Sequence, residues 1–351
     1  MKRYPKVLIS YFFGSNKIPL GSSCARALKV LGCEVLCFDS GVDSQIDRFF
    51  LKPINKLVWN TGLEYIDISR NSRWNNQNLR QRLLEKAIIE FKPNILLVLR
   101  GHGFNGEYLN DLKQKYKIEK IVGWWVKGPK WFDLMKTEAE IYDHYFCIHK
   151  VGYTEKDRIY YFPVLAVDNL PYRPIFDHKE KQYKYDITFV GGWTEKRQEI
   201  LGKIADFTVT IYGPKWRRKN LLNFRFKHKI KGAGIWENNL VNLYNTTKIA
   251  LNISAWDTEK FSGLNFRVFD IPACGSFLLT DYSDELKEYF MIGEEIETYR
   301  NINELNDKLL FYLKNEVTRE KIALRGYEKV LSFDTFEDKM AAWLKKVWFS
   351  N

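Results

Sequence analysis

The sequence predicts an α/β protein made of two doubly wound, Rossmann-like domains with mostly parallel sheets. Three observations lead to this fold class. With 351 residues, the chain is long for one hydrophobic core and suits two domains of ordinary size. Short apolar runs of strand length alternate with helix-length segments in both halves. A polar stretch over residues 163–185, marked by prolines, is the candidate linker between them.

Composition narrows the class of protein and of partner. Hydrophobic residues make up 45% of the chain and charged residues 28%, which is typical of a globular protein and excludes a disordered one. The 55 Lys and Arg against 43 Asp and Glu leave a net charge of +12. This balance favours anionic partners, namely nucleotide phosphates, an anionic membrane surface or nucleic acid, and does not choose among them.

The cysteines and the apolar runs predict a cytoplasmic protein, with peripheral membrane contact as an option. The five cysteines are scattered, which suits buried reduced thiols, and they lack the paired spacing of a zinc site. Residues 7–13 are too short and too broken for a signal peptide and are interpreted as a first strand. No segment approaches the roughly 18 apolar residues of a membrane-spanning helix.

The N-terminal half opens with a βαβ pattern. The strand over 7–13 is followed by a loop with Gly14 and Ser15, and Ser22 and Ser23 are placed to cap a helix over 25–31. A second strand follows over 34–38. The loop lacks the G-x-G-x-x-G pattern, so it is either a structural turn or one wall of a ligand site, in which Gly14 and Ser15 would lie on the acceptor side.

A strand over 95–99 leads into a short segment with Arg100 and His102, the latter between two glycines. Ligands of open α/β sheets bind at the carboxyl ends of strands, so both residues are candidates for the site. His102 is the candidate catalytic group, for acid–base chemistry, acceptor positioning or phosphate binding, and a structural histidine is the alternative. Trp125, near the end of a strand over 118–126, is a candidate for stacking on an acceptor sugar, although most Trp side chains pack in cores.

The C-terminal half repeats the alternation of strand and helix. A strand over 186–190 runs into Gly191 and Gly192, and the next helix, which starts at Trp193 or Thr194, carries Lys196 and Arg197. Residues 207–212 are the following strand. Residues 215–231 then contain eight Lys or Arg and no acid, interleaved with aromatic side chains. This basic segment is typical either of nucleic-acid or lipid binding or of a solvated loop beside a phosphate site.

The stretch over 261–281 carries the densest chemistry. Gly263 suits a tight turn or a close backbone approach, and a helix-length segment with Asn265, Arg267 and Asp270 follows. Gly275 ends that helix before a buried strand over 277–279. A helix start beside an arginine suits phosphates, and a carboxylate one turn on suits ribose hydroxyls; an ordinary α/β turn is the alternative.

The remaining chain is helical. Helices are expected over 303–313, with Asn303 as the N-cap, and over 318–330, and residues 335–349 present one apolar face. We expect this tail to pack back on the N-terminal domain. The predicted division is residues 1–170, residues 171–335 and the returning helix 336–351.

The segment from Asn265 to Asp281, N-F-R-V-F-D-I-P-A-C-G-S-F-L-L-T-D, resembles the C-terminal signature of the CgeB-like glycosyltransferases, which belong to the GT-B group. The resemblance continues downstream through Gly293, Glu294 and Thr335, and upstream through residues 186–191 and 251–253. It implies a GT-B fold, in which two Rossmann-like domains face each other across a cleft and the C-terminal domain binds a nucleotide sugar.

The resemblance also implies roles for individual residues. Asp270 takes the position of the acid that holds the ribose hydroxyls. The remaining donor-side residues are assigned to the pyrophosphate (Gly263, Leu264, Asn265), to the charge of the diphosphate leaving group (Arg197, with Lys196 or Arg267), to close approach of the phosphates (Gly191, Gly192) and to the base (Tyr212). Arg197, from the resemblance, and His102, from its place after a strand, are the expected catalytic residues.

The implied activity is transfer of a sugar from a nucleotide donor, a UDP-sugar, to an acceptor, with retention, which is the tendency of the group. The absence of a D-x-D motif agrees with a reaction that needs no metal or cofactor. The acceptor is open among a glycan, a lipid-linked molecule, a protein and nucleic acid. The sequence departs from the pattern at Ser262, where many retaining GT-B enzymes have Glu, and at Asp270, which is usually Glu. Two alternatives remain: a nucleic-acid-binding protein that uses residues 215–231, and a GT-B protein that binds a sugar nucleotide without turnover.

Overall fold

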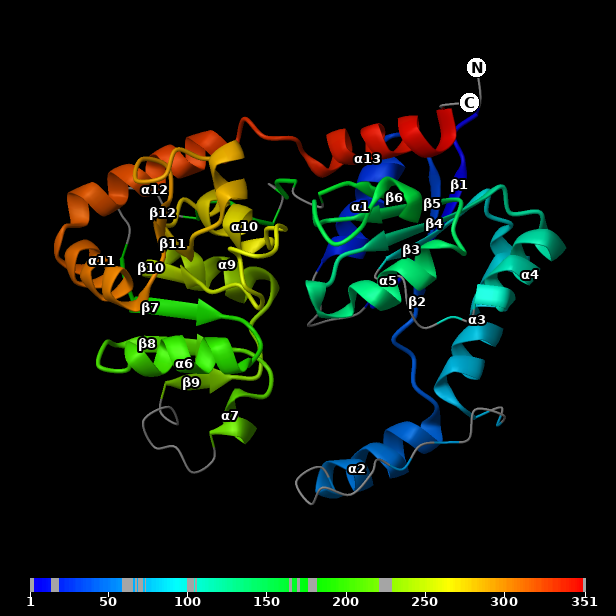
Figure 1. Cartoon of the computed structure of the whole chain (residues 1–351), viewed down its shortest axis with the longest axis horizontal. Coiled ribbons are helices and arrows are strands. Elements are labelled where there is room, and N and C mark those ends of the chain that lie inside the picture. Colours follow the sequence, from blue (N-terminus) through cyan, green and yellow to red (C-terminus); the bar gives the residue numbers. More distant parts are fainter. Residues whose placement is uncertain are drawn as a thin grey trace.

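Two six-stranded parallel sheets form the two halves of the protein (Figure 1). The computed structural model describes residues 3–13, 19–58, 66, 68, 72, 74–99, 104, 106–163, 166–168, 171–175, 182–220 and 229–349. Four predicted site residues, Gly14, Ser15, Arg100 and His102, lie outside these ranges. The predicted α/β class with two doubly wound sheets is confirmed.

The N-terminal sheet has the strand order β2-β1-β3-β4-β5-β6, and every neighbouring pair is parallel. Its central strands are apolar throughout because helices cover both faces. The strands are β1 (Lys6–Tyr11), β2 (Glu34–Asp39), β3 (Ile95–Leu99), β4 (Lys120–Trp125), β5 (His144–Cys147) and β6 (Ile159–Tyr161). The helices of this half are α1 (Leu20–Val30), α2 (Lys52–Val58), α3 (Asn76–Phe91), α4 (Gly106–Tyr116) and α5 (Phe132–Ala139).

The C-terminal sheet has the order β12-β11-β10-β7-β8-β9 and is also parallel. Its strands are β7 (Tyr185–Val190), β8 (Val209–Tyr212), β9 (Ile230–Gly232), β10 (Thr247–Asn252), β11 (Leu278–Asp281) and β12 (Glu297–Tyr299). The helices are α6 (Glu195–Lys203), α7 (Trp216–Lys219), α9 (Glu237–Asn245), α10 (Arg267–Ala273), α11 (Ile302–Lys314) and α12 (Glu316–Val330). One apolar core lies on each face of the sheet.

Side-chain caps fix several helix starts, and two of the predicted caps are wrong. Helix α6, predicted to start at Trp193 or Thr194, begins at Glu195, and Thr194 caps it by accepting a hydrogen bond from the Arg197 N–H at 3.2 Å. Helix α11 is capped by Asn301, whose Oδ1 accepts from the Glu304 N–H at 3.0 Å, and not by Asn303, because the helix already begins at Ile302. Helix α1 begins at Leu20, so Ser23 lies inside it and its hydroxyl donates instead to Asp168 at 2.5 Å.

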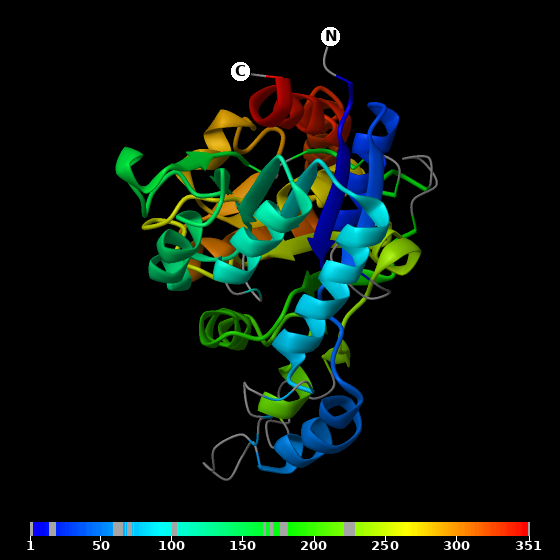
Figure 2. The same cartoon turned by 90° about the vertical axis from the view of Figure 1, so that its right-hand side faces the viewer.

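Between β2 and α3 the chain leaves the body of the N-terminal half. Helix α2 and the short π-helix before it, η1 (Asp47–Leu51), extend away from the sheet, as Figure 2 shows. None of the described helices is long and apolar enough to cross a membrane.

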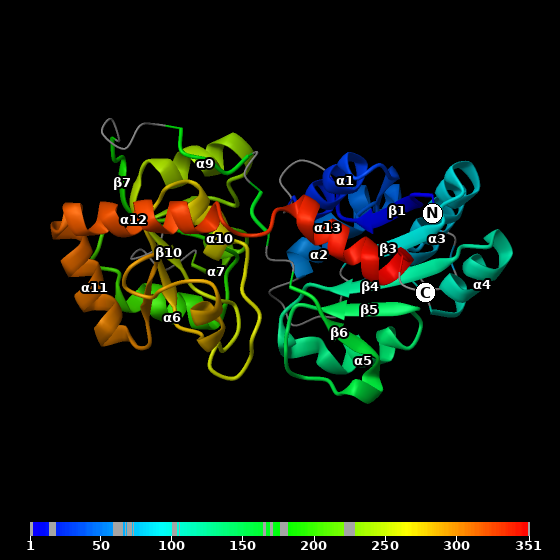
Figure 3. The ribbon, with the colours of Figure 1, turned by 90° about the horizontal axis from the view of Figure 1, so that it is seen from above.

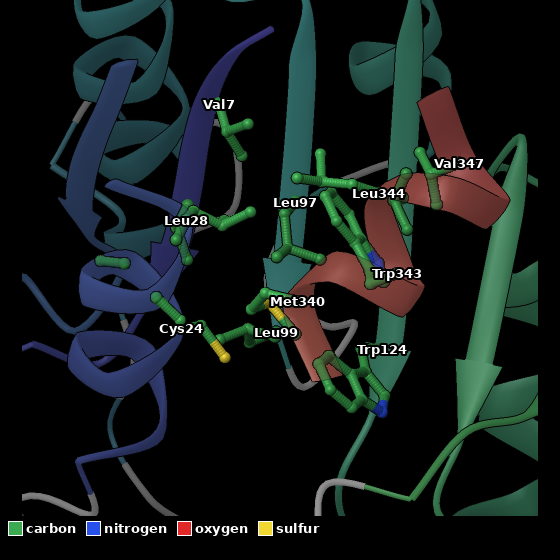
Figure 4. Packing of buried hydrophobic residues seen from close by; sticks show 14 of the residues in the cluster. Val7, Cys24, Leu28, Leu97, Leu99, Trp124, Met340, Trp343, Leu344 and Val347 are labelled. Carbon is green, nitrogen blue, oxygen red and sulfur yellow. The ribbon is translucent and has the colours of Figure 1, made fainter. Parts of the chain in front are cut away.

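Helix α13 (Phe336–Leu344) carries the chain back from the C-terminal half to the N-terminal half. Seen from above, α12 lies over the C-terminal sheet and α13 over the N-terminal one (Figure 3). Thr335 and Asp338 form a capping box that starts α13. Met340, Trp343 and Leu344 then share one core with residues of α1, β1 and β3 (Figure 4).

We predict that Trp343→Ala destabilises the N-terminal half by about 3–5 kcal/mol, because it empties a fully buried site between α13 and the sheet. Urea unfolding followed by circular dichroism measures the loss. Val317→Ala on α12, where the side chain is 84% exposed, is the control and should change stability by less than about 0.5 kcal/mol. Equal stability of the two variants would contradict the packing described for α13.

Candidate functional site

The loops that follow the strands of the two sheets meet at one place. His149 follows β5 and Trp256 follows β10, and their rings lie 5.4 Å apart, edge to face. A side-chain carbon added at Gly128, after β4, would lie 3.2 Å from the ring of Trp256. Because ligands of open α/β sheets bind at the carboxyl ends of the strands, this meeting point is the candidate site.

Arg197 is a buried cation at the carboxyl end of β7. Its Nε donates to the carbonyl oxygen of Ile253 at 2.9 Å and its Nη1 to that of Gly192 at 2.8 Å. Burial, followed by the nearby charge of Arg267, lowers the pKa of Arg197 to about 9, so the guanidinium stays protonated at neutral pH. The two carbonyls hold it in place but carry no full negative charge.

Arg267, the first residue of α10, is the second cation. Its Nε donates to Oδ1 of Asn252, the last residue of β10, at 2.8 Å. Burial lowers the pKa of Arg267, against the opposing influence of Tyr244, Asp270 and Asp281. Among the described residues neither Arg197 nor Arg267 forms a salt bridge, so a buried and a half-buried positive charge influence each other with no carboxylate paired to either.

Lys196 adds a third positive charge beside the pair. Its Nζ donates to Asp281 Oδ2 at 3.0 Å and to the Trp256 carbonyl at 2.7 Å. Asp281, at the end of β11, also accepts from the N–H and the hydroxyl of Ser254, each at 3.0 Å. This network ties the ends of β7, β10 and β11 together.

Asp270 is buried on α10 beside the segment that joins the two halves. Burial first, and then the charge of Asp168, raise the pKa of Asp270 well above its usual range, while Arg267 and a hydrogen bond with Tyr172 oppose the rise. Asp168 is itself held by the Ser23 hydroxyl and by Arg26 Nη2, each at 2.5 Å. Folding without a ligand therefore shifts the carboxyl of Asp270 toward its protonated form, relative to an aspartate exposed to water.

The loop around Gly263 has the tight backbone that the sequence predicts. Gly263 has a φ of +100°, and a side-chain carbon there would lie 2.6 Å from His149 Nδ1, so only glycine fits. Its N–H, expected to approach a pyrophosphate, already donates to Oε2 of Glu285 at 2.5 Å. Leu264 is buried in the core, and Asn265 accepts from the Arg267 N–H at 3.2 Å. In this conformation these residues shape the loop and leave the cations free to face a ligand.

The other predicted residues fall in two places. The Gly191 N–H donates to the Tyr212 carbonyl at 2.8 Å, which aligns the ends of β7 and β8, and Tyr212 lines a groove with Tyr185 and Trp236.

The prediction for Trp125 is wrong: its side chain is fully buried with Met135 and Tyr145 behind the sheet, so it does not stack on an acceptor. The signal that favoured it, its place at a strand end, does not say to which face of the strand the ring points.

The basic segment is partly described. Trp216 is fully buried and donates to the Gly191 carbonyl at 2.7 Å, so it is no platform for a base. Arg217 donates to the Lys231 carbonyl at 2.9 Å, and Lys229 donates to the carbonyls of Ala205 and Phe207. Residues 221–228 lie outside the described part of the chain.

His149 and Glu285 belong to the site and were not among the predicted residues. Both follow strands, β5 and β11, so the rule that favoured His102 would have found them had it been applied to every strand. Within the described ranges no group of three or more His, Cys, Asp or Glu side chains could hold a metal ion.

Comparison with known proteins finds sequence similarity to a glycosyl transferase-like family and to one curated protein. A family model described as glycosyl transferase-like matches residues 194–345, which contain all of α6, α10 and β11. Spore protein CgeB of Bacillus subtilis (strain 168) is 24% identical over 278 residues, which cover 73% of this chain and 83% of that protein.

Solved structures give the same fold over nearly the whole chain. Alr3699/HepE of Anabaena in complex with UDP-glucose superposes with a TM-score of 0.64 at 10% identity, over 98% of this chain and 100% of that one. An alpha-glucosyltransferase in complex with UDP-glucose and DNA containing an abasic site reaches 0.65 at 9% identity, over 98% and 99%. With the two parallel sheets described above, these matches identify the chain as a protein of the GT-B glycosyltransferase fold, distantly related to spore protein CgeB.

Proposed function

We propose that this protein is a glycosyltransferase that moves a sugar from a UDP-sugar to an acceptor. The observation that carries the proposal is the pair of guanidinium groups of Arg197, which is buried, and Arg267, which is half-buried, with Lys196 nearby. Departure of the sugar leaves a diphosphate whose negative charge grows as the glycosidic bond breaks. Cations held in place before the reaction stabilise that charge without having to reorganise. A diphosphate between Arg197 and Arg267 would also relieve the repulsion that lowers the pKa of Arg197.

Asp270 is the residue proposed to hold the ribose hydroxyls. Its carboxylate form is costly in the free protein, and the charge of Arg267 partly offsets this cost. The hydroxyls of a bound ribose would donate hydrogen bonds to that carboxylate and favour the ionised form further. Nucleotide binding and ionisation of Asp270 would therefore support each other.

We further propose that the reaction needs no metal and retains the configuration of the sugar. The first part is supported by Lys196, Arg197 and Arg267, which would supply the charge neutralisation that a divalent cation supplies elsewhere. The second is supported only by the family resemblance, and Ser262 stands where many retaining relatives have Glu. The anomeric configuration of the product, read by NMR, tests it.

Nucleic-acid binding is the second candidate function, because Trp216, in the described part of the basic segment, contacts Gly191 at the site, and two similar structures contain DNA. The contacts of Trp216, Arg217 and Lys229 with the protein itself argue against this segment as the main functional surface. A nucleic acid is better placed as one of the possible acceptors, beside a glycan, a lipid-linked molecule or a protein. The test below includes it.

UDP at about 100 times its dissociation constant should stabilise the protein by about 2.7 kcal/mol. We expect a rise in melting temperature with UDP, measured by differential scanning fluorimetry, and a smaller rise with ADP or a short single-stranded DNA. Adding EDTA should leave the rise unchanged. Stabilisation by DNA with no response to any nucleotide would replace the proposal with the second candidate, and hydrolysis of a UDP-sugar would exclude a binding protein without turnover.

Arg197→Lys should weaken UDP binding by about 1.5–3 kcal/mol, because lysine keeps the charge but loses the fixed pair of donors that position it. Isothermal titration calorimetry measures the difference. Lys203→Met, at the other end of α6 and exposed to solvent, removes a full charge from the same helix and is the matched control. Weakening by Lys203→Met together with unchanged binding by Arg197→Lys would mean that only the overall charge of the helix matters.

Asp270→Asn should abolish stabilisation by UDP and change how stability depends on pH. The raised pKa of Asp270 means that folding favours the protonated carboxyl, so the wild type loses stability as pH rises above the ordinary value of 3.8. The loss is at most about 1.4 kcal/mol per pH unit, and the Asn variant lacks it. Urea unfolding of both proteins without nucleotide at pH 5 and pH 7.5 measures the difference; parallel pH profiles would show that Asp270 ionises normally.

A further inference from the structure

The loop over residues 261–265, which borders the proposed donor site, is held from both sides. The Gly263 N–H donates to Oε2 of Glu285, which belongs to the C-terminal half, and Oε1 of Glu285 accepts from the Tyr161 hydroxyl of the N-terminal half at 3.0 Å. The Lys150 N–H donates to the Ser262 hydroxyl oxygen at 2.7 Å. Residues at the ends of β5 and β6 thus contact the loop that precedes α10.

His149 makes the central contact between this loop and the N-terminal half. Its imidazole is fully buried, with Nε2 lying 2.8 Å from the carbonyl oxygen of Lys127 and Nδ1 against the carbonyl oxygen of Ser262. Both partners are carbonyl oxygens, which only accept. A neutral imidazole donates from one nitrogen, so only the imidazolium satisfies both contacts. Lys127 lies in the same half as His149, whereas Ser262 lies in the other.

Neighbouring aromatic rings and a backbone hydrogen bond also hold the imidazole ring of His149 in place. Phe132 of α5 and Trp256 contact it edge to face, and the Cys147 sulfur accepts from its backbone N–H. The charged residues nearest to His149, along the chain and among the contacts of the loop, are Lys127, Lys150 and Glu285. The side chain of Lys150 pairs with Glu288 at 2.5 Å. Burial lowers the pKa of His149, and its two carbonyl partners oppose that effect.

We propose that His149 is a positioning residue that locks the loop over 261–265 against the N-terminal half, so that nucleotide-sugar binding is coupled to closure of the two halves. The proposal rests on the proposed function, because the loop leads directly into α10 with Arg267 and Asp270. Opening would break the bond to Ser262 and leave the bond to Lys127. A donor that binds the closed arrangement better than the open one shifts the protein toward closure. The contact between His149 and Ser262 determines how much of the free energy of closure the donor must supply.

The two bonds can be separated by substitution. In His149→Asn the side-chain amide lies near the position of Nδ1 and retains a donor toward Ser262. In His149→Gln it lies near the position of Nε2 and retains a donor toward Lys127 only. We expect His149→Gln to weaken UDP binding about tenfold, within the usual range of coupling between sites, and His149→Asn to weaken it less than threefold. Small-angle X-ray scattering without nucleotide should show a larger radius of gyration for the Gln variant only.

A milder pair of variants covers the case in which both substitutions of the buried histidine impair folding. Tyr161→Phe removes only the hydroxyl that donates to Glu285 and should weaken UDP binding in the same direction. Tyr160→Phe, on the neighbouring and more exposed residue, is the control and should bind as the wild type does.

The outcomes separate this inference from the proposed function. Wild-type protein that binds no nucleotide refutes the proposed function, and the scattering comparison of His149→Gln with His149→Asn still tests the lock. Wild-type binding of UDP, with His149→Gln equally tight and equally compact, overturns the lock and leaves the function standing. Equal weakening by Asn and Gln also overturns it, because the bond between the halves would then carry no special weight.

Discussion

Every strand of both sheets is parallel to its neighbours, and this constraint places all the loops that follow the strands at one edge of each sheet. Arg197 follows β7, Asn252 and Asp281 end β10 and β11, and His149 follows β5. These residues are far apart in the chain and meet because the topology leaves them no other edge. The parallel direction of the strands therefore places the site residues together, and the helices on the outer faces mainly bury the sheets.

Electrostatics gives that edge its chemical character. Two guanidinium groups, one buried (Arg197) and one half-buried (Arg267), lie near enough for their charges to interact, and their hydrogen bonds go to neutral acceptors, the carbonyls around Arg197 and the amide of Asn252. Such an arrangement is unfavourable without an anion, since burial penalises each charge and the two repel each other. The negative charge of Asp270 is disfavoured as well, because burial, and then the charge of Asp168, raise its pKa. A ligand that brings a diphosphate and hydroxyl groups would relieve both conditions.

The two halves are joined by more than the linker. Helix α13 packs on the N-terminal sheet and continues from α12 of the C-terminal half, so the chain crosses between the halves twice. Asp168, in the first crossing, binds Ser23 and Arg26 of α1 and lowers the tendency of Asp270 to ionise. On the opposite side His149, Lys150 and Tyr161 contact the loop before α10. Movement between the halves therefore changes the surroundings of the residues proposed to bind the donor.

The sequence by itself determined the fold class, the glycine-ended strands, the start of α6 to within two residues and the cations Lys196, Arg197 and Arg267, because these depend on local periodicity and on residue type. Only the tertiary structure decided which of them face one another. Trp125 is buried in the core although it ends a strand. The Ser23 hydroxyl donates to Asp168 and does not cap a helix, and the Gly263 N–H donates to Glu285. His149 and Glu285 joined the site through contacts between residues more than 100 and more than 20 positions apart. Spacing along the chain carries no record of such contacts, since they arise only when two separately folded sheets come together.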